Sequence, residues 1–77
     1  MDKTNTPAAR RSVAAATLAC SAEQIGSHHE ARTAGATAGR LAQSAGLSLD
    51  WLSGQVPALL TLPGHAWEGA VDAFHSR

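Results

Sequence analysis

Large apolar side chains are unevenly distributed along this chain. After Met1, the first forty residues contain only Val13, Leu18 and Ile25 besides alanine and one cysteine, whereas twelve such side chains lie between Leu41 and Phe74. Burial of apolar surface contributes roughly 25 cal/mol per Å². We therefore expect the second half to provide most of the hydrophobic driving force, and the first half to fold by packing against it.

The first half of the chain predicts two short helices after a polar arm. Residues 1–7 are polar and end in Pro7, which is typical of a flexible arm or a helix cap. Alanine-rich residues 8–20 favour a helix but offer little surface to bury. Ser21 is expected to cap a second helix, with Glu23 in its first turn, that runs to about residue 31.

Turn-forming residues divide the next part of the chain. A third helix is expected over residues 33–45, with Gly46 ending it as a C-terminal cap. Ser48 is then expected to cap a short helix over residues 49–53. Together these elements place a helical domain over residues 8–54.

Residues 55–77 predict an apolar connector followed by an amphipathic helix. The connector is interrupted by Pro57 and by the pair Pro63 and Gly64. The last helix is expected from His65 to about His75, with an apolar stripe at i, i+3, i+4 and i+7. The stripe predicts a face that packs on the chain's own core or forms a dimer contact, and it includes Trp67, Val71 and Phe74.

The segment from Arg40 to Gly54 carries a family resemblance. Its Arg-Leu-Ala helix end, its Ala-Gly-Leu turn and its Ser-Leu-Asp-Trp-Leu run resemble the close of phage-repressor and Cro-type helix-turn-helix domains. The similarity extends over roughly residues 12–54. It implies an all-α fold of four or five short helices, with a lambda-repressor-like helix-turn-helix at its centre. The chain departs from the family in having only nine residues before Arg10 and no turn glycine at Ala19.

The resemblance also implies a function and a set of contact residues. It implies a small transcriptional regulator that binds double-stranded DNA sequence-specifically as a homodimer. Base-edge contacts are expected from Ala22, Glu23 and Ser27. Phosphate contacts are expected from Ser21, Gln24, Arg32 and Arg11. The segment after Ser21, which would contact the bases, is expected to be held outward by one compact hydrophobic cluster. That cluster would consist of Leu18, Ile25, Leu41, Leu47, Trp51 and Leu52.

Composition modifies this expectation. The 77 residues fit one small domain, and six basic and six acidic residues give zero formal charge, which disfavours strong nonspecific DNA binding. The single cysteine, Cys20, excludes an internal disulfide and favours a reducing, cytoplasmic location. No apolar run is long enough for a membrane span.

Catalytic and metal-binding motifs are not recognised. The chain has no glycine-rich phosphate loop and no Gly-x-Ser-x-Gly, so we expect neither an enzyme nor a cofactor. The histidines have no i, i+4 spacing, and no metal site is expected from His28, His29, His65 and His75.

A second resemblance leads to a different class of function. Trp67-Glu68-Gly69 resembles the Trp-x-Gly turn of small type VII secreted helical-hairpin proteins. Those proteins are interaction partners that pair through long alanine-rich helices, and residues 8–45 could form the first of these helices. The alternative is therefore a protein–protein interaction module, either such a hairpin or a small helical adaptor or inhibitor.

Overall fold

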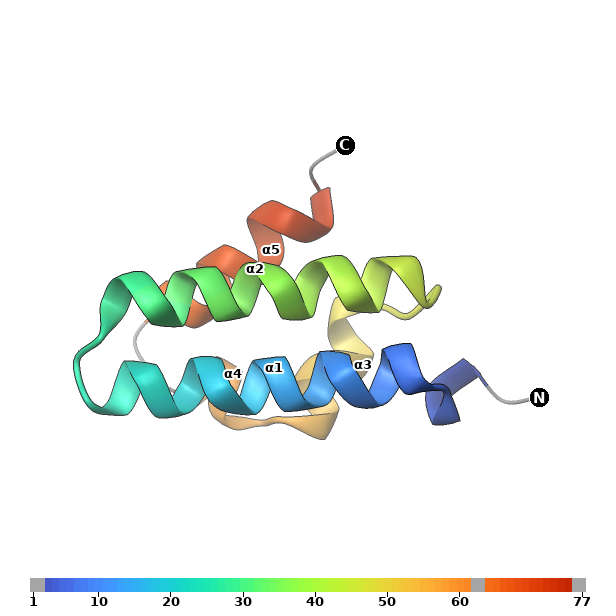
Figure 1. The fold of residues 1–77 in the computed structure, drawn as a ribbon, viewed down its shortest axis with the longest axis horizontal. Coiled ribbons are helices and arrows are strands. Elements are labelled where there is room, and N and C mark those ends of the chain that lie inside the picture. Colours follow the sequence, from blue (N-terminus) through green and yellow to red (C-terminus); the bar gives the residue numbers. More distant parts are fainter. Residues whose placement is uncertain (1–2, 62–63, 76–77) are drawn as a thin grey trace.

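Two long antiparallel helices form a hairpin in the computed structural model, which describes residues 3–61 and 64–75 (Figure 1). They are α1 (Pro7–Gln24) and α2 (His28–Ser44). A third helix, α5 (His65–His75), packs against α2. The described residues contain helices and no strand, which confirms the all-α class.

Shorter elements complete the bundle. A 3-10 turn, η1 (Lys3–Asn5), precedes α1. The helices α3 (Leu49–Gln55) and α4 (Ala58–Thr61) pass behind α1 in Figure 1 and connect α2 to α5. Residues 1–2, 62–63 and 76–77, which belong to the expected arm, connector and C-terminal segment, lie outside the described residues. No described helix has the length and hydropathy needed to cross a membrane.

The expected helix boundary at Ser21 is wrong. Ser21 lies inside α1, and its carbonyl accepts the backbone N–H of Ile25. The chain turns instead at Gly26, whose φ of 81° is accessible to glycine at little cost. The N–H of Ser27 closes the helix end by donating to the carbonyl of Ala22 at 2.9 Å. The expected helix over residues 21–31 therefore does not form.

Three other boundaries agree with the sequence prediction. Gly46 has φ 73° and ends α2, and Ser48 caps α3 by accepting the N–H of Trp51 at 2.9 Å. The last helix covers residues 65–75 as expected. Before α1 the structure agrees with the helix-cap alternative, because Thr6 caps α1 by accepting the N–H of Ala9 at 3.1 Å and Pro7 is the first residue of the helix.

The α1–α2 interface is built from small side chains. Ala16 and Ala19 on α1 and Ala38 on α2 are fully buried, and the hydroxyl of Ser12 donates to the carbonyl of Ala38 at 3.0 Å. Such residues let two helix backbones approach closely. The alanine-rich first half is therefore a close-packing surface rather than a weak core.

The expected hydrophobic cluster of six residues forms only in part. Leu47 and Leu52 are buried, and Trp51 packs against the core at partial burial. Leu18 and Ile25 are instead 63% and 78% exposed, because alanines occupy the face of α1 that meets α2. The idea that these residues hold a segment outward after Ser21 is therefore wrong.

Helix α5 packs through a face next to the predicted one. Its buried residues are Ala66, Gly69, Ala70 and Ala73. The larger side chains of the predicted stripe are only half-buried, and of these Trp67 packs against the core. Gly69 lies inside the helix and against α2, so the Trp-x-Gly sequence does not form a hairpin turn.

Candidate functional site

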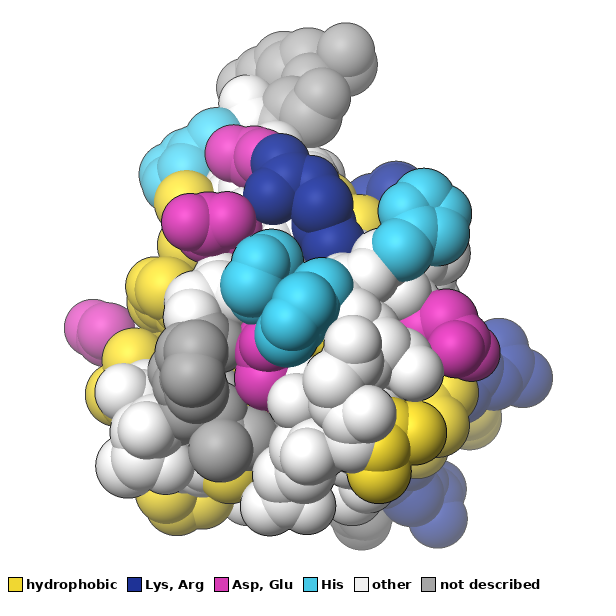
Figure 2. Space-filling model, turned by 90° about the vertical axis from the view of Figure 1, so that its left-hand side faces the viewer, with side chains coloured by type: hydrophobic (Ala, Val, Ile, Leu, Met, Phe, Trp, Pro, Cys, Tyr) yellow, Lys and Arg dark blue, Asp and Glu magenta, His cyan; other side chains and the backbone are white. Residues whose placement is uncertain are grey.

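A polar cluster occupies the end of the molecule where α1 turns into α2. Its members are Glu23, His28 and His65, from the last turn of α1 and the first residues of α2 and α5. Figure 2 shows histidine and acidic side chains gathered in the middle of this end of the molecule. The fold thus brings three titratable side chains together from three helices.

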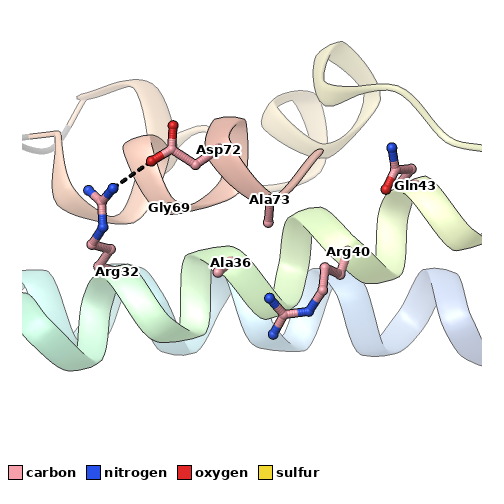
Figure 3. A pocket seen from close by; sticks show the side chains of 7 residues that line it. All are labelled: Arg32, Ala36, Arg40, Gln43, Gly69, Asp72 and Ala73. Carbon is pink, nitrogen blue, oxygen red and sulfur yellow. Dashed lines mark hydrogen bonds and ion pairs between the residues drawn. The ribbon is translucent and has the colours of Figure 1, made fainter. Parts of the chain in front are cut away.

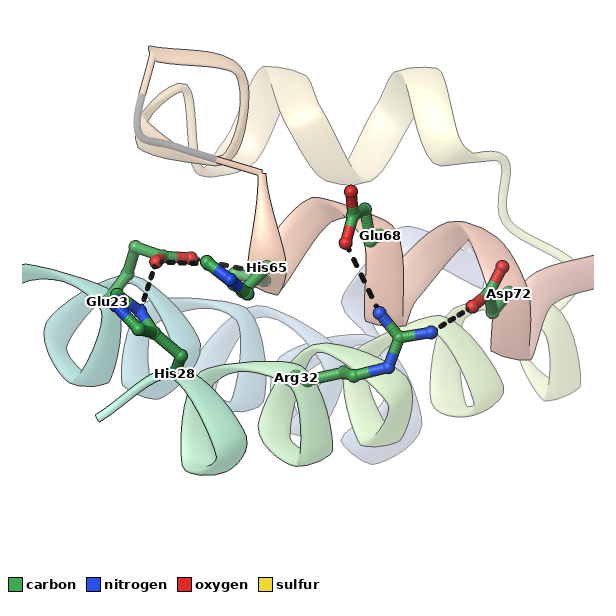
Figure 4. A network of polar contacts seen from close by, with 7 residues as sticks. Glu23, His28, Arg32, His65, Glu68 and Asp72 are labelled. Carbon is green, nitrogen blue, oxygen red and sulfur yellow. Dashed lines mark hydrogen bonds and ion pairs between the residues drawn. The ribbon is translucent and has the colours of Figure 1, made fainter. Parts of the chain in front are cut away.

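Both oxygens of the Glu23 carboxylate are used (Figure 4). Oε2 lies 2.9 Å from Nδ1 of His65 and 3.1 Å from Nδ1 of His28. Oε1 accepts the backbone N–H of Ala66 at 3.0 Å. The two imidazole rings stack with centroids 4.2 Å apart and an interplanar angle of 18°. One carboxylate therefore organises both rings and the start of α5.

Burial differs sharply within the cluster. The Glu23 side chain is 1% exposed, whereas those of His28 and His65 are 55% and 42% exposed. Burial alone raises the pKa of Glu23, but the hydrogen bonds from Ala66, His65 and His28 outweigh it and hold this pKa below its ordinary value. The cluster thus has a buried, charged carboxylate on its inner side and two solvent-accessible imidazole rings on its outer side.

A neighbouring thiol responds to the same environment. Cys20 lies one turn before Glu23 on α1 and is buried. Burial raises the pKa of its thiol, and the negative charge of Glu23 raises it further. Cys20 is therefore a poor nucleophile in this setting and packs as a small apolar side chain.

Local sequence explains how the cluster is positioned. The glycine turn at Gly26 reverses the chain, so that Glu23 and His28 meet across it although they are five residues apart. The first backbone N–H groups of a helix have no partner within the helix. The Glu23 carboxylate is such a partner for the N–H of Ala66 at the start of α5. Its negative charge also complements the positive end of the α5 dipole.

A second polar contact joins α2 to α5. The Arg32 guanidinium donates to Glu68 and Asp72 on successive turns of α5 (Figure 4). All three side chains are about half exposed or more, so these ion pairs contribute little to stability. They lie beside an open groove of about 380 Å³ that Arg40 and Gln43 also line (Figure 3).

The residues expected to contact DNA do not form one exposed reading surface. Four of them, Ser21, Ala22, Glu23 and Gln24, form the last turn of α1, where Ala22 and Glu23 are buried. Base contacts by Ala22 and Glu23 stay a prediction, which their burial in this structure does not favour. The buried positions result from α1 continuing through residue 21.

The remaining expected contact residues are scattered. Ser27 immediately precedes α2 and makes no side-chain cap. Arg32 is engaged by α5, and Arg11 lies near the opposite end of α1. Sequence reasoning missed His28 and His65 because it compared only the histidines with one another. A carboxylate five residues before His28, across a glycine, was an available signal.

No family model, curated protein or solved structure matches this chain. Its function is therefore inferred from the contacts and surfaces described above. Two features stand out, the polar cluster around Glu23 and the exposed apolar side chains of α1.

Proposed function

We propose that this chain is a homotypic helical interaction module, in which α1 of one copy packs against α1 of a second copy. The observation that carries the proposal is an uncharged, partly apolar stripe on the outer face of α1. The proposal develops the interaction-module alternative from the sequence and names the surface and its occupant.

The stripe has the spacing of a helix–helix seam. Ala14, Leu18, Ser21 and Ile25 follow one another at intervals of four, three and four residues, and all four are exposed. This spacing places them along one side of a helix, as in the a and d positions of a coiled coil. The two large apolar side chains exposed along this line are Leu18 on α1 and Ile25, which directly follows α1 as its C-cap.

Charge is missing from this side of the helix after Arg11. No charged residue occurs between Arg11 and Glu23, and Glu23 is turned inward. The outer face of a surface helix ordinarily carries charged and polar side chains. An exposed face without them over three turns is suited to a partner surface that is also small and uncharged.

A groove beside the stripe can receive a side chain of the partner. It has a volume of about 430 Å³ and lies between α1 and α2. Leu18 and Ala22 line it from α1, and the α2 side is lined by His29, Glu30, Thr33, Ala34 and Thr37. A two-fold axis beside Leu18 would place the same leucine of each copy over the other copy's groove, which is the self-complementary contact of a symmetric dimer.

The test is the oligomeric state measured over a wide range of concentration. Analytical ultracentrifugation of the wild-type chain is expected to show a dimer that dissociates on dilution. The double variant Leu18→Ser/Ile25→Ser is expected to stay monomeric. Leu60→Ser is the matched control, because Leu60 is similarly exposed, at 62%, but lies on α4.

Two results would contradict the proposal. One is a wild-type chain that is monomeric at every concentration. The other is an equal loss of association in Leu60→Ser, which would indicate nonspecific apolar contact. Circular dichroism of each variant checks that the helices remain formed.

Repressor-type DNA binding stays a prediction. Its support is the resemblance of residues 12–54 to the helix-turn-helix family, together with exposed Arg10 and Arg11 at the start of α1. Duplex DNA added to the same samples at low salt tests it. Complex formation that weakens as salt rises would favour it.

A further inference from the structure

The donor atoms of the cluster around Glu23 are separated by distances similar to those between the ligand atoms of a metal site. One carboxylate oxygen of Glu23 and one ring nitrogen from each of His28 and His65 lie within 4.8 Å of one another. Adjacent ligands of a tetrahedral Zn²⁺, with bonds of ~2.0–2.1 Å, are separated by roughly 3.3 Å. The two oxygen–nitrogen distances, 2.9 and 3.1 Å, are close to that separation.

The donor types agree with the geometry. Imidazole nitrogen is a ligand for zinc and neighbouring first-row metals, and a carboxylate adds the negative charge that offsets the ion. Two histidines and one glutamate form an open site, in which water or another molecule completes the coordination. We propose that Glu23, His28 and His65 bind one divalent transition-metal ion per chain. This site is independent of the α1 stripe.

The protein holds the carboxylate in place for such an ion. Oε1 of Glu23 accepts the N–H of Ala66, which leaves Oε2 directed at the two rings. Groups that hydrogen-bond to a ligand without binding the metal, as the N–H of Ala66 would here, orient the ligand and raise metal affinity. The rings are about half exposed, so an ion can enter from solvent without opening the core.

Binding requires a small rearrangement of the rings. In the structure the rings are stacked, and each Nδ1 lies within hydrogen-bond distance of Oε2. An ion can be bound only if each coordinating nitrogen is unprotonated and the two rings turn until their lone pairs converge. A neutral ring meets the first condition by carrying its proton on Nε2, so binding through Nδ1 requires a change of tautomer and no net loss of a proton.

A bound ion would join the ends of three helices. Since the unfolded chain does not hold the three donors together, binding stabilises the folded state. The experiment is isothermal titration of the chelator-stripped full chain with Zn²⁺, accompanied by thermal unfolding. We expect one ion per chain, a higher Tm with Zn²⁺, and no change with Mg²⁺, which prefers oxygen ligands.

Three histidine variants make the test specific. His28→Gln and His65→Gln are each expected to lower Zn²⁺ affinity by at least about tenfold, because losing a ligand costs no less than losing its supporting partner. His29→Gln is the matched control, since His29 is adjacent and exposed but outside the cluster. Its affinity should equal that of the wild type.

The proposal is overturned if Zn²⁺ leaves Tm unchanged, or if His29→Gln weakens binding as much as His28→Gln. The half-exposed positions of His28 and His65 allow both variants to fold, and circular dichroism verifies this. The absorption spectrum of Co²⁺-loaded protein gives an independent readout. Intense visible bands, typical of four-coordinate Co²⁺, are expected in the wild type and should be lost in His65→Gln.

Discussion

The backbone N–H of Ala66 donates to Oε1 of Glu23 across 43 residues of sequence, at 3.0 Å. This bond fixes the beginning of α5 against the end of α1. Most other contacts of α5 are made to α2 through small residues, so the position of α5 along α1 is set largely at this point. A single buried carboxylate therefore links the hairpin to the last helix.

Removing that carboxylate should destabilise the chain. Glu23→Ala leaves the N–H of Ala66 without its partner and removes the acceptor of both rings. A hydrogen bond to a buried charged group contributes about 1.5–3 kcal/mol, and we expect a decrease of this size in the free energy of unfolding. Urea unfolding in the presence of a chelator measures it.

Glu30→Ala provides the comparison. Glu30 is exposed in the first turn of α2, where its interaction with the helix dipole contributes less than about 1 kcal/mol. Equal losses in Glu23→Ala and Glu30→Ala would contradict the assigned role of Glu23.

The same carboxylate should make stability depend on pH. The pKa of Glu23 is lower in the folded chain than in the unfolded one, so its contribution is fully present above the unfolded pKa. The contribution is lost as the pH falls through the folded pKa, because the unfolded chain then binds the proton more readily. Chelator-treated wild type should lose more stability between pH ~5 and ~2 than Glu23→Gln does. If the free energy of unfolding falls equally with pH in the two proteins, Glu23 does not contribute to the pH dependence of stability.

Much of the helix pattern could be predicted from local signals. Gly46 and Ser48 define the boundary between α2 and α3 by local chemistry, and these positions were predicted correctly. Ser21 carries an equally good local signal but lies inside α1. The difference is tertiary, because packing of α1 against α2 favours a continuous helix that ends at Gln24, just before the turn at Gly26.

The candidate site was harder to predict. Glu23 has the same local sequence whether it faces solvent or the interior, and only the docking of α5 decides that it is buried. His65 is 42 residues away from Glu23, and no spacing rule connects them. Gly35 and Gly39 permit this docking by close backbone contact with α5, and nothing in the local sequence indicates that contact.

Glycine at position 39 should be essential for that close contact. A Cβ built on Gly39 would lie 2.3 Å from the carbonyl oxygen of Ala70, which is backbone and cannot rotate away. Gly39→Ala is therefore expected to force α2 and α5 apart, at a cost of about 1–3 kcal/mol despite the higher helix propensity of alanine. Thermal and urea unfolding of the variant measure this cost.

Glycine at position 54 is the matched control within the same chain. Gly54 also lies in a helix, α3, but a Cβ built there meets nothing within 4 Å. Gly54→Ala should therefore raise stability by about 0.5–1 kcal/mol, because alanine loses less backbone freedom on folding. Opposite signs for the two substitutions would show that the α2–α5 contact, rather than glycine content, limits stability. A stabilising effect of Gly39→Ala would mean that α5 is not packed on α2 in solution.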